Sequence, residues 1–210
     1  MLKKQLEIVL SQLREIEKPK PELEQYTIPG DLAADILNLA YIAGDVKGKT
    51  VVDLGCGSGR LAIGALLMGA KKAIAVDSDK AVLKTAKENV KIVERLTNQK
   101  ISKKIQFVAS DVTKAKVKGD TVIQNPPYGI QKKHADRDFL DMAFKSAKKV
   151  YSLHRSYYES RGFISNFVGQ RKGKIEKIIK FKFRIPYMFR FHKKSVIQFD
   201  VDLFVMERMK

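Results

Sequence analysis

The sequence predicts an α/β fold built on a mostly parallel, buried sheet. Between residues 50 and 123, short apolar runs alternate with stretches of helical periodicity, an arrangement typical of βαβ units. A glycine-rich turn, Gly55–Gly59, separates the first apolar run from the helical stretch that follows it. Two long alternating runs near the end of the chain, Ile175–Phe183 and Ser195–Met206, indicate an antiparallel strand pair.

The elements can be assigned in order along the chain. We expect residues 1–18 to form an amphipathic helix, because apolar residues recur there at helical spacing until two prolines follow. Residues 19–30 are then a linker, and Asp31 is expected to cap a helix over residues 32–43. The later elements are a strand at 50–54, a helix at 61–68, a strand at 73–77, a helix at 80–96, strands at 105–108 and 121–123, an apolar run at 149–153, a helical stretch around 155–168 and the closing strand pair. The length suits a single domain over residues 1–210.

Composition narrows the class of protein. The 41 Lys and Arg against 23 Asp and Glu give a net charge of +18, so a polyanion such as RNA is the leading partner class. The single cysteine excludes a disulfide framework and a cysteine-based zinc site on this chain, and we predict no metal site. No run approaches the ~18–20 apolar residues that a spanning helix needs, so we expect a soluble, cytoplasmic protein without membrane contact.

The turn after the first strand reads Asp53-Leu54-Gly55-Cys56-Gly57-Ser58-Gly59. Its G-x-G-x-G spacing lacks the third glycine of a dinucleotide fingerprint, where Arg60 stands instead, which argues against a nicotinamide or flavin cofactor. Asp77 ends the second strand, where a carboxylate can accept both hydroxyl protons of a ribose. Asp111 follows the third strand. One such acid would be ordinary turn chemistry, but three in order around a glycine loop predict a cofactor site. The loop resembles motif I of class I S-adenosylmethionine-dependent methyltransferases.

The fourth strand runs directly into Asn125-Pro126-Pro127-Tyr128. This motif resembles motif IV of methyltransferases that act on exocyclic amines: N6 of adenine, N2 of guanine, N4 of cytosine or the amide of glutamine. Such an amine is a poor nucleophile because its lone pair is delocalised. The Asn125 side-chain oxygen and the Pro126 carbonyl can accept both N–H groups and direct the lone pair at the methyl sulfonium. Tyr128 offers a face for stacking a flipped-out base.

Four further segments narrow the family: Glu24-Gln25-Tyr26-Thr27, Val150-Tyr151-Ser152-Leu153-His154, Phe191-His192-Lys193-Lys194-Ser195 and Asp200-Val201-Asp202-Leu203. Together they closely resemble the methyltransferase-like family that makes N6-methyladenine in small-subunit ribosomal RNA, including its archaeal members. The resemblance extends over about residues 24–203. It implies a Rossmann-like class I methyltransferase fold with a seven-stranded, mostly parallel sheet, helices on both faces and an antiparallel C-terminal pair. It also implies a small zinc-ribbon activator subunit that covers an exposed sheet edge.

The resemblance assigns the site residues by position. In that family Gln25 and the following Thr/Ile positions close over the cofactor, and here Thr27 precedes Ile28, which occupies the family's threonine position. The linker is therefore expected to cover S-adenosylmethionine. The expected cofactor residues are Gln25, Thr27, Ile28, Asp53, Gly55, Gly57, Ser58, Gly59, Asp77, Asp111 and Val112, and the expected catalytic residues are Asn125, Pro126, Pro127 and Tyr128.

The basic tail agrees with an RNA substrate. Residues 171–194 hold ten Lys or Arg and a single acid, with aromatic residues interleaved, and this mixture suits phosphate contacts and base stacking. We expect Phe181 and Phe183 to belong to the core. The expected RNA contacts are Phe189, Phe191, His192, Lys193 and Lys194. Two alternatives stay open: a glutamine methyltransferase that acts on a protein release factor, and a non-catalytic basic RNA-binding module.

Overall fold

One seven-stranded sheet organises the chain in the order β3-β2-β1-β4-β5-β7-β6. The structure is a computed structural model, and it describes residues 1–129, 135–186 and 196–209. Strands β1 to β5 are parallel neighbours, whereas β7 is antiparallel to both β5 and β6. The predicted fold class, a mostly parallel sheet with an antiparallel C-terminal pair, is therefore confirmed.

The strands are β1 (Thr50–Leu54), β2 (Lys72–Asp77), β3 (Ile105–Ala109), β4 (Thr121–Gln124), β5 (Lys149–Arg155), β6 (Gly173–Pro186) and β7 (Val196–Arg208). The helices are α1 (Lys3–Ser11), α2 (Gly30–Ile42), α3 (Arg60–Leu67), α4 (Lys80–Thr97), α5 (Ala135–Ser146) and α6 (Tyr158–Gln170), with short 3₁₀ turns η1 (Pro21–Leu23) and η2 (Val112–Lys114). Among the described residues, no helix is long and apolar enough to cross a bilayer.

Two apolar layers enclose the sheet. Residues of α1–α4 form one hydrophobic cluster with one face of the sheet, and residues of α5 and α6 form a second cluster with the other face. Phe183 is fully buried in the first cluster and Phe181 packs against it, so both belong to the core as predicted. Strands β1, β2, β4 and β5 are buried along most of their length, which explains their continuous apolar runs, whereas the edge strand β3 is partly exposed.

The N-terminal helix is shorter than predicted. It ends at Ser11 rather than near residue 18, although Leu13 and Ile16 stay buried beyond its end. The backbone of Arg14 is bound on both sides by one side chain: Asn89 Oδ1 accepts from its N–H and Asn89 Nδ2 donates to its carbonyl. These tertiary hydrogen bonds replace the helical ones, so the apolar spacing continues without a helix.

Two other expectations are corrected. Helix α2 already begins at Gly30, so Asp31 lies inside its first turn rather than at the cap, and its carboxylate accepts from the neighbouring N–H of Leu32. Helix α5 was not predicted at all. Its first turn carries Asp136 and Asp138, which suits a helix N-terminus.

The contacts of Asn89 yield a test of how the N-terminal segment is held. Asn89 is fully buried and also donates to the Ser58 carbonyl. Replacing it with Ala leaves the buried Ser58 carbonyl and the partly buried N–H and carbonyl of Arg14 without this partner. Asn89→Ala should therefore lower the free energy of unfolding by about 1–3 kcal/mol in urea titrations. The matched control is Asn166→Ala on the exposed face of α6, which should change stability by less than about 0.5 kcal/mol. Equal effects of the two substitutions would contradict this role of Asn89.

Candidate active site

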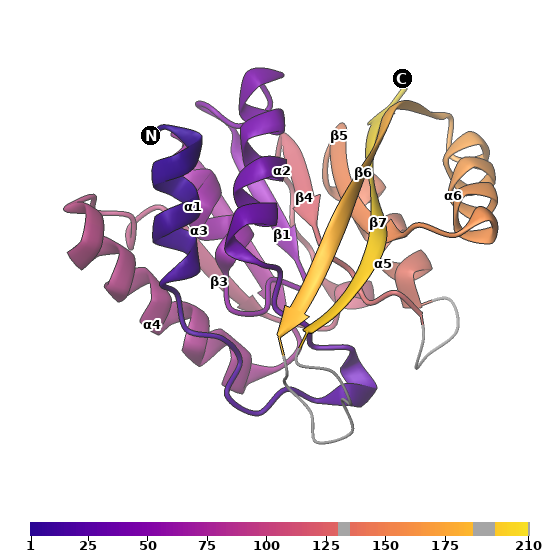
Figure 1. Cartoon of the computed structure of the whole chain (residues 1–210). Coiled ribbons are helices and arrows are strands. Elements are labelled where there is room, and N and C mark those ends of the chain that lie inside the picture. The colour runs from indigo at the N-terminus through magenta and orange to yellow at the C-terminus, as the bar shows by residue number, and fades with distance from the viewer. Residues whose placement is uncertain (130–134, 187–195, 210) are drawn as a thin grey trace.

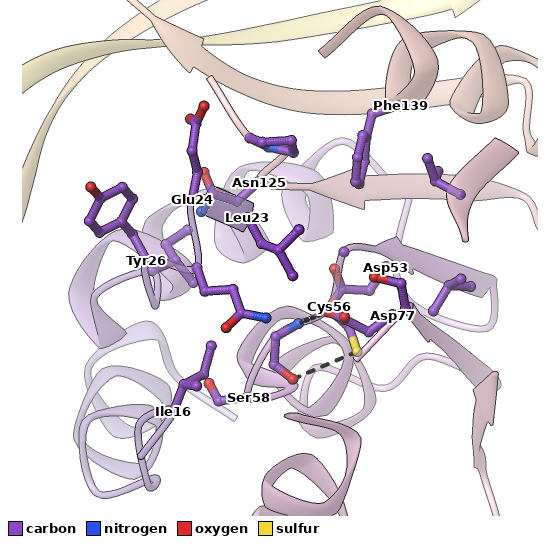
Figure 2. Close-up of a pocket in the computed structure, with 18 of the residues that line it drawn as sticks. Ile16, Leu23, Glu24, Tyr26, Asp53, Cys56, Ser58, Asp77, Asn125 and Phe139 are labelled. Atoms are coloured by element: carbon purple, nitrogen blue, oxygen red, sulfur yellow. Dashed lines mark hydrogen bonds between the residues drawn. The ribbon is translucent and has the colours of Figure 1, made fainter. Parts of the chain in front are cut away.

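A cavity of about 330 Å³ opens at the carboxyl ends of β1, β2 and β4. Its wall is formed by the linker after α1, the glycine loop, the ends of β2 and β3, the segment after β4, and α5 (Figure 2). This is the edge at which open α/β sheets bind ligands, and the volume lies within the usual range for small-molecule sites. The cavity is thus the natural place for a bound cofactor.

The glycine loop shapes the floor of this cavity. Gly55 has a φ of 69°, and a Cβ there would lie 2.8 Å from a ring carbon of Phe139 on α5. Gly57 has a φ of 53° and donates its N–H to Asp77 Oδ2 at 3.0 Å, as the dashed line in Figure 2 shows. L side chains rarely adopt such backbone angles. The loop therefore needs glycine at both positions to reach Asp77 and leave room for Phe139.

Asp53 is the most deeply buried acid of the site. Its Oδ2 accepts the N–H of Ala62 in the first turns of α3 at 3.0 Å. Its Oδ1 is buried and has no hydrogen-bond partner among the described residues. Burial raises the pKa of Asp53 to about 8, opposed by the Ala62 N–H. An unpaired, buried carboxyl oxygen is costly, and a cationic ligand in the cavity would compensate it.

Asp77 and Asp79 prepare the end of β2. Asp77 Oδ1 accepts the N–H of Asp79 at 3.0 Å. Burial raises the pKa of Asp77, and its hydrogen bonds from the Asp79 and Gly57 N–H groups oppose the rise. Asp79 faces outward to the linker: Lys20 Nζ lies 2.8 Å and Gln25 Nε2 3.2 Å from Asp79 Oδ2. The hydrogen bond from Lys20 holds the pKa of Asp79 near 2.

Arg60, the first residue of α3, holds the N-terminal linker by hydrogen bonds to its backbone. Its guanidinium is buried and donates to the carbonyl of Ile28 at 2.7 Å and to that of Leu13 at 3.2 Å. Glu15 lies 3.6 Å away as its counter-charge. Burial lowers the pKa of Arg60. Because the two carbonyls bracket residues 14–27, one side chain holds both ends of the segment that covers the cavity.

The motif after β4 is tied to the same segment. The Tyr128 hydroxyl donates to Asn125 Oδ1 at 2.8 Å, and the Tyr128 N–H donates to Glu24 Oε2 at 2.6 Å. The Asn125 amide is therefore oriented by the hydroxyl of its own motif. In Figure 2, Glu24 and Asn125 lie at one end of the cavity and Asp53 and Asp77 at the other. The site thus has a cofactor end and an acceptor end.

The ring of Tyr128 is packed edge-on against Phe183 and Phe199, with centroids 6.2 and 6.0 Å apart. Those two phenylalanines stack on each other at 5.3 Å. Burial raises the pKa of the Tyr128 hydroxyl well above its usual range, so this group stays a hydrogen-bond donor. The structure shows the Tyr128 ring packed on these two phenylalanines, and stacking of a base on the ring stays a prediction.

The structure brings most of the predicted residues together. Those that line the cavity are Gln25, Thr27, Ile28, Asp53, Gly55, Gly57, Ser58, Asp77, Asp111, Val112, Asn125 and Pro127. Gly59, Pro126 and Tyr128 do not line it: Gly59 packs on Ala86 of α4, and Tyr128 reaches the site through Asn125. Phe189, Phe191, His192, Lys193 and Lys194 lie outside the described residues.

Sequence reasoning left several residues that line the cavity unassigned, among them Ile16, Glu24, Arg60 and Phe139. Arg60 carried a signal, because a charged residue that opens an otherwise apolar helix needs partners. Glu24 lies in one of the four segments that resemble the family. Phe139 follows the two acids of α5, which mark a helix start. Ile16 continued the periodicity of α1 and gave no separate signal.

Comparison with known proteins agrees with this geometry. A family model for ribosomal protein L11 methyltransferase matches residues 37–126, which include the glycine loop, Asp77 and Asn125. An uncharacterised protein of Methanocaldococcus jannaschii is 42% identical, with 99% of this chain and 94% of that protein covered. The zebrafish rRNA N(6)-adenosine-methyltransferase METTL5 is 34% identical, with 95% of each chain covered. The chain belongs to the METTL5 family.

Solved structures show the same fold. A crystal structure from Pyrococcus horikoshii, described as a candidate RNA methyltransferase, superposes with a TM-score of 0.91 and 39% identity over 100% of this chain and 99% of that one. A Synechocystis magnesium protoporphyrin IX methyltransferase with S-adenosylmethionine bound shares the fold at a TM-score of 0.64 and 18% identity, over 85% of this chain and 78% of that one. Membership in a methyltransferase family confirms S-adenosylmethionine as the expected cofactor.

The residues of the cavity fit this cofactor. Asp53 Oδ1 and Thr27 Oγ1 are buried polar atoms without hydrogen-bond partners among the described residues, and both residues line the cavity. A sulfonium with an α-amino group supplies positive charge for the first of these. A ribose would supply hydroxyl donors for the carboxylate of Asp77, which can accept more than one hydrogen bond on each oxygen.

The raised pKa of Asp53 predicts a pH dependence of cofactor binding. Below about pH 8 the buried carboxyl is protonated, and a cationic ligand favours its ionised form, so binding should release close to one proton at neutral pH. Affinity should therefore rise as the pH increases from about 6 to 7.5. Calorimetry in two buffers of different ionisation enthalpy measures the release, with Asp53→Asn as control. The same proton count for wild type and Asp53→Asn would contradict the assignment.

Proposed function

We propose that this protein transfers a methyl group from S-adenosylmethionine to the exocyclic N6 amine of an adenine in ribosomal RNA, with small-subunit ribosomal RNA as the target. The observation that carries the proposal is the orientation of Asn125 Oδ1 by the Tyr128 hydroxyl at the acceptor end of the cavity. Support comes from relatives named as rRNA N(6)-adenosine methyltransferases in zebrafish and Drosophila, at 34% and 31% identity.

The cofactor end of the cavity would bind S-adenosylmethionine and orient its methyl group. Asp53 would face the cationic amino-acid part, Asp77 the ribose hydroxyls, and Asp111 with Val112 the adenine. The cofactor supplies an electrophilic methyl group on a positively charged sulfur. The linker residues Gln25, Thr27 and Ile28 would close over it, and their position against Asp79 and Arg60 supports this role. A closed roof also excludes water from the sulfonium.

The acceptor end prepares the amine. Asn125 Oδ1 and the Pro126 carbonyl accept its two N–H groups, which favours a pyramidal nitrogen with its lone pair directed at the methyl group. The Tyr128 hydroxyl keeps the oxygen of the Asn125 amide, rather than its NH₂, in the accepting position. Catalysis is then mainly orientation and support of the positive charge that develops on nitrogen. The methylated nitrogen becomes acidic and loses its proton without a dedicated base.

RNA is the proposed macromolecular substrate. The net charge of +18 favours a polyanion, and we place RNA contacts at Phe189, Phe191, His192, Lys193 and Lys194. These residues join β6 to β7, whose neighbour β5 runs parallel to β4. We also retain the small zinc-ribbon activator subunit as a proposal; β3 and β6 are the edge strands of the sheet at which such a subunit could pair.

Product analysis tests the proposed reaction. Total RNA from a strain that lacks the gene is incubated with the protein and labelled S-adenosylmethionine, then digested to nucleosides. The label should appear in N6-methyladenosine and, after fractionation, in small-subunit ribosomal RNA. Label in another nucleoside would replace adenine as the target. Label in protein and none in RNA would favour a glutamine methyltransferase.

Asn125→Ala tests the acceptor end. The substitution removes one acceptor for the target amine and leaves the cofactor end intact. Single-turnover methyl transfer should therefore fall about 100-fold or more, as for other preorganised groups at a reacting centre. Affinity for S-adenosylmethionine, measured by calorimetry, should stay within about twofold, a change of under 0.5 kcal/mol. A near wild-type single-turnover rate would exclude this role for Asn125.

Lys193 and Lys194 test the basic segment. Each phosphate neutralised on single-stranded RNA contributes about −0.7 to the slope of log affinity against log salt. The double change to Ala should therefore flatten the slope by roughly 1.4, while cofactor affinity stays unchanged. If the slope equals that of the wild type, these lysines do not contact phosphate.

A further inference from the structure

Strand β5 ends beside the acceptor end of the cavity. It runs parallel to β4, with Gln124 in register with Ser152, so the residues that follow the two strands emerge at the same edge of the sheet. Those after β4 begin with Asn125, and those after Ser152 lead to Arg155 and then to Tyr157 and Tyr158 at the start of α6. Proximity to the acceptor end follows from the topology alone.

A continuous stack of side chains leads from the catalytic motif to this surface. The Tyr128 ring contacts Phe199 edge-on at 6.0 Å. The Arg155 guanidinium carbon lies 3.9 Å from the centroid of Phe199 and 5.1 Å from that of Tyr157. Arg155 also donates to the Tyr157 hydroxyl. The guanidinium is thus held between two rings, and Tyr157 is fixed relative to Tyr128.

The outer end of this stack is open to solvent. Tyr157 is 52% exposed and Tyr158 is 89% exposed. Arg155 forms no ion pair with an acid in the part of the chain that the structure describes. The surface therefore combines two exposed aromatic rings with a positive charge. Charge and aromatic faces together are the chemistry that binds unpaired nucleotides.

We propose that Arg155, Tyr157 and Tyr158 form a stacking surface for an unpaired RNA base that flanks the target nucleotide. The tyrosine rings stack on the base, and the guanidinium, which lies over the Phe199 ring and donates to the Tyr157 hydroxyl, faces the adjacent phosphate. The surface lies outside the basic segment, residues 187–195, and adds a contact to those proposed there. This inference rests on the proposed function, because it takes RNA as the substrate.

The physical reason for such a surface is the removal of the target base from its neighbours. A base that enters the cavity loses its stacking partners. A flanking base that stacks on Tyr157 or Tyr158 recovers part of that energy and fixes the strand at a set distance from Asn125. Stacking tolerates any base, so this contact positions the strand, whereas the cavity selects the base.

Equilibrium binding of a short, fluorescein-labelled, single-stranded RNA with one adenosine tests the proposal. Tyr157→Ala and Tyr158→Ala should each weaken binding by about fivefold or more, since an aromatic ring is lost from the stack. Tyr158→Phe keeps the ring and should bind within about twofold of wild type. Arg155→Lys keeps the charge but loses the planar group between the rings, so it should also weaken binding.

A matched control removes a tyrosine near the amino ends of the parallel strands, at the opposite end of the sheet from the cavity. Tyr41 is 38% exposed in the last turn of α2, close to Asp45, whose carbonyl accepts from Thr121 at the start of β4. Tyr41→Ala should bind this RNA as the wild type does. Unchanged affinity for S-adenosylmethionine in all the variants shows that the fold is intact.

A second readout reports stacking itself. In the same RNA, 2-aminopurine replaces the nucleotide next to the adenosine, and its fluorescence falls when it stacks. Quenching on binding should be present with the wild type and Tyr158→Phe and reduced with Tyr158→Ala and Tyr157→Ala. Equal losses for Tyr158→Phe and Tyr158→Ala would point to the hydroxyl and overturn the stacking account.

The two proposals fail separately. If the wild type methylates RNA but the alanine variants bind and quench as it does, the stacking surface is wrong and the proposed function stands. If the tyrosines are needed for binding a protein and not the RNA, the stacking surface is again wrong. If the wild type neither binds nor methylates RNA, both proposals fall.

Discussion

The guanidinium of Arg60 donates to two backbone carbonyls that lie fifteen residues apart, those of Leu13 and Ile28. It opens α3, directly after the glycine loop, so it joins the N-terminal segment to the floor of the cavity. Burying such a charge is costly unless it is hydrogen-bonded and paired. The two Nη atoms donate to these carbonyls and Glu15 lies nearby, whereas Nε is buried without a hydrogen-bond partner among the described residues. The segment from Ile16 to Thr27, which contributes to the wall of the cavity, lies between these two hydrogen-bonded carbonyls.

The segment between these carbonyls connects the two ends of the active site. Lys20 and Gln25 bind Asp79 next to the cofactor end, and Glu24 binds the N–H of Tyr128 at the acceptor end. Tyr128 in turn orients Asn125 and packs on Phe199, on which Arg155 stacks. The family's two motifs are therefore joined by a third segment as well as by the sheet. A cofactor that orders the segment between Leu13 and Ile28 would also stabilise motif IV through Glu24.

Local pattern was sufficient to predict the sheet. Strands β1 to β4 depend on β-branched runs and glycine turns that are short in sequence, and their predicted bounds agree with the structure within about one residue. Contacts between distant residues were not predictable in this way. The backbone of Arg14, just beyond the end of α1, is bound by Asn89, 75 residues away, and Glu24 binds Tyr128 across 104 residues. The turn at Gly55 was predicted to form part of the cofactor site. Its neighbour Phe139 could not be predicted, because it lies on α5, a helix that the sequence pattern did not reveal.

The N-terminal segment, held by Arg60, positions motif IV through the hydrogen bond between Glu24 and the Tyr128 N–H. Amide hydrogen exchange of the Tyr128 N–H in the wild type and in Arg60→Met tests it most directly. Glu24 accepts the hydrogen bond of this N–H, and Arg60 donates instead to the carbonyls of Leu13 and Ile28. We predict faster exchange at Tyr128 and across residues 23–28 in the variant, with the amides of β1 and β4 as protected as before. Unchanged protection of Tyr128 alongside freed amides at residues 23–28 would contradict the coupling.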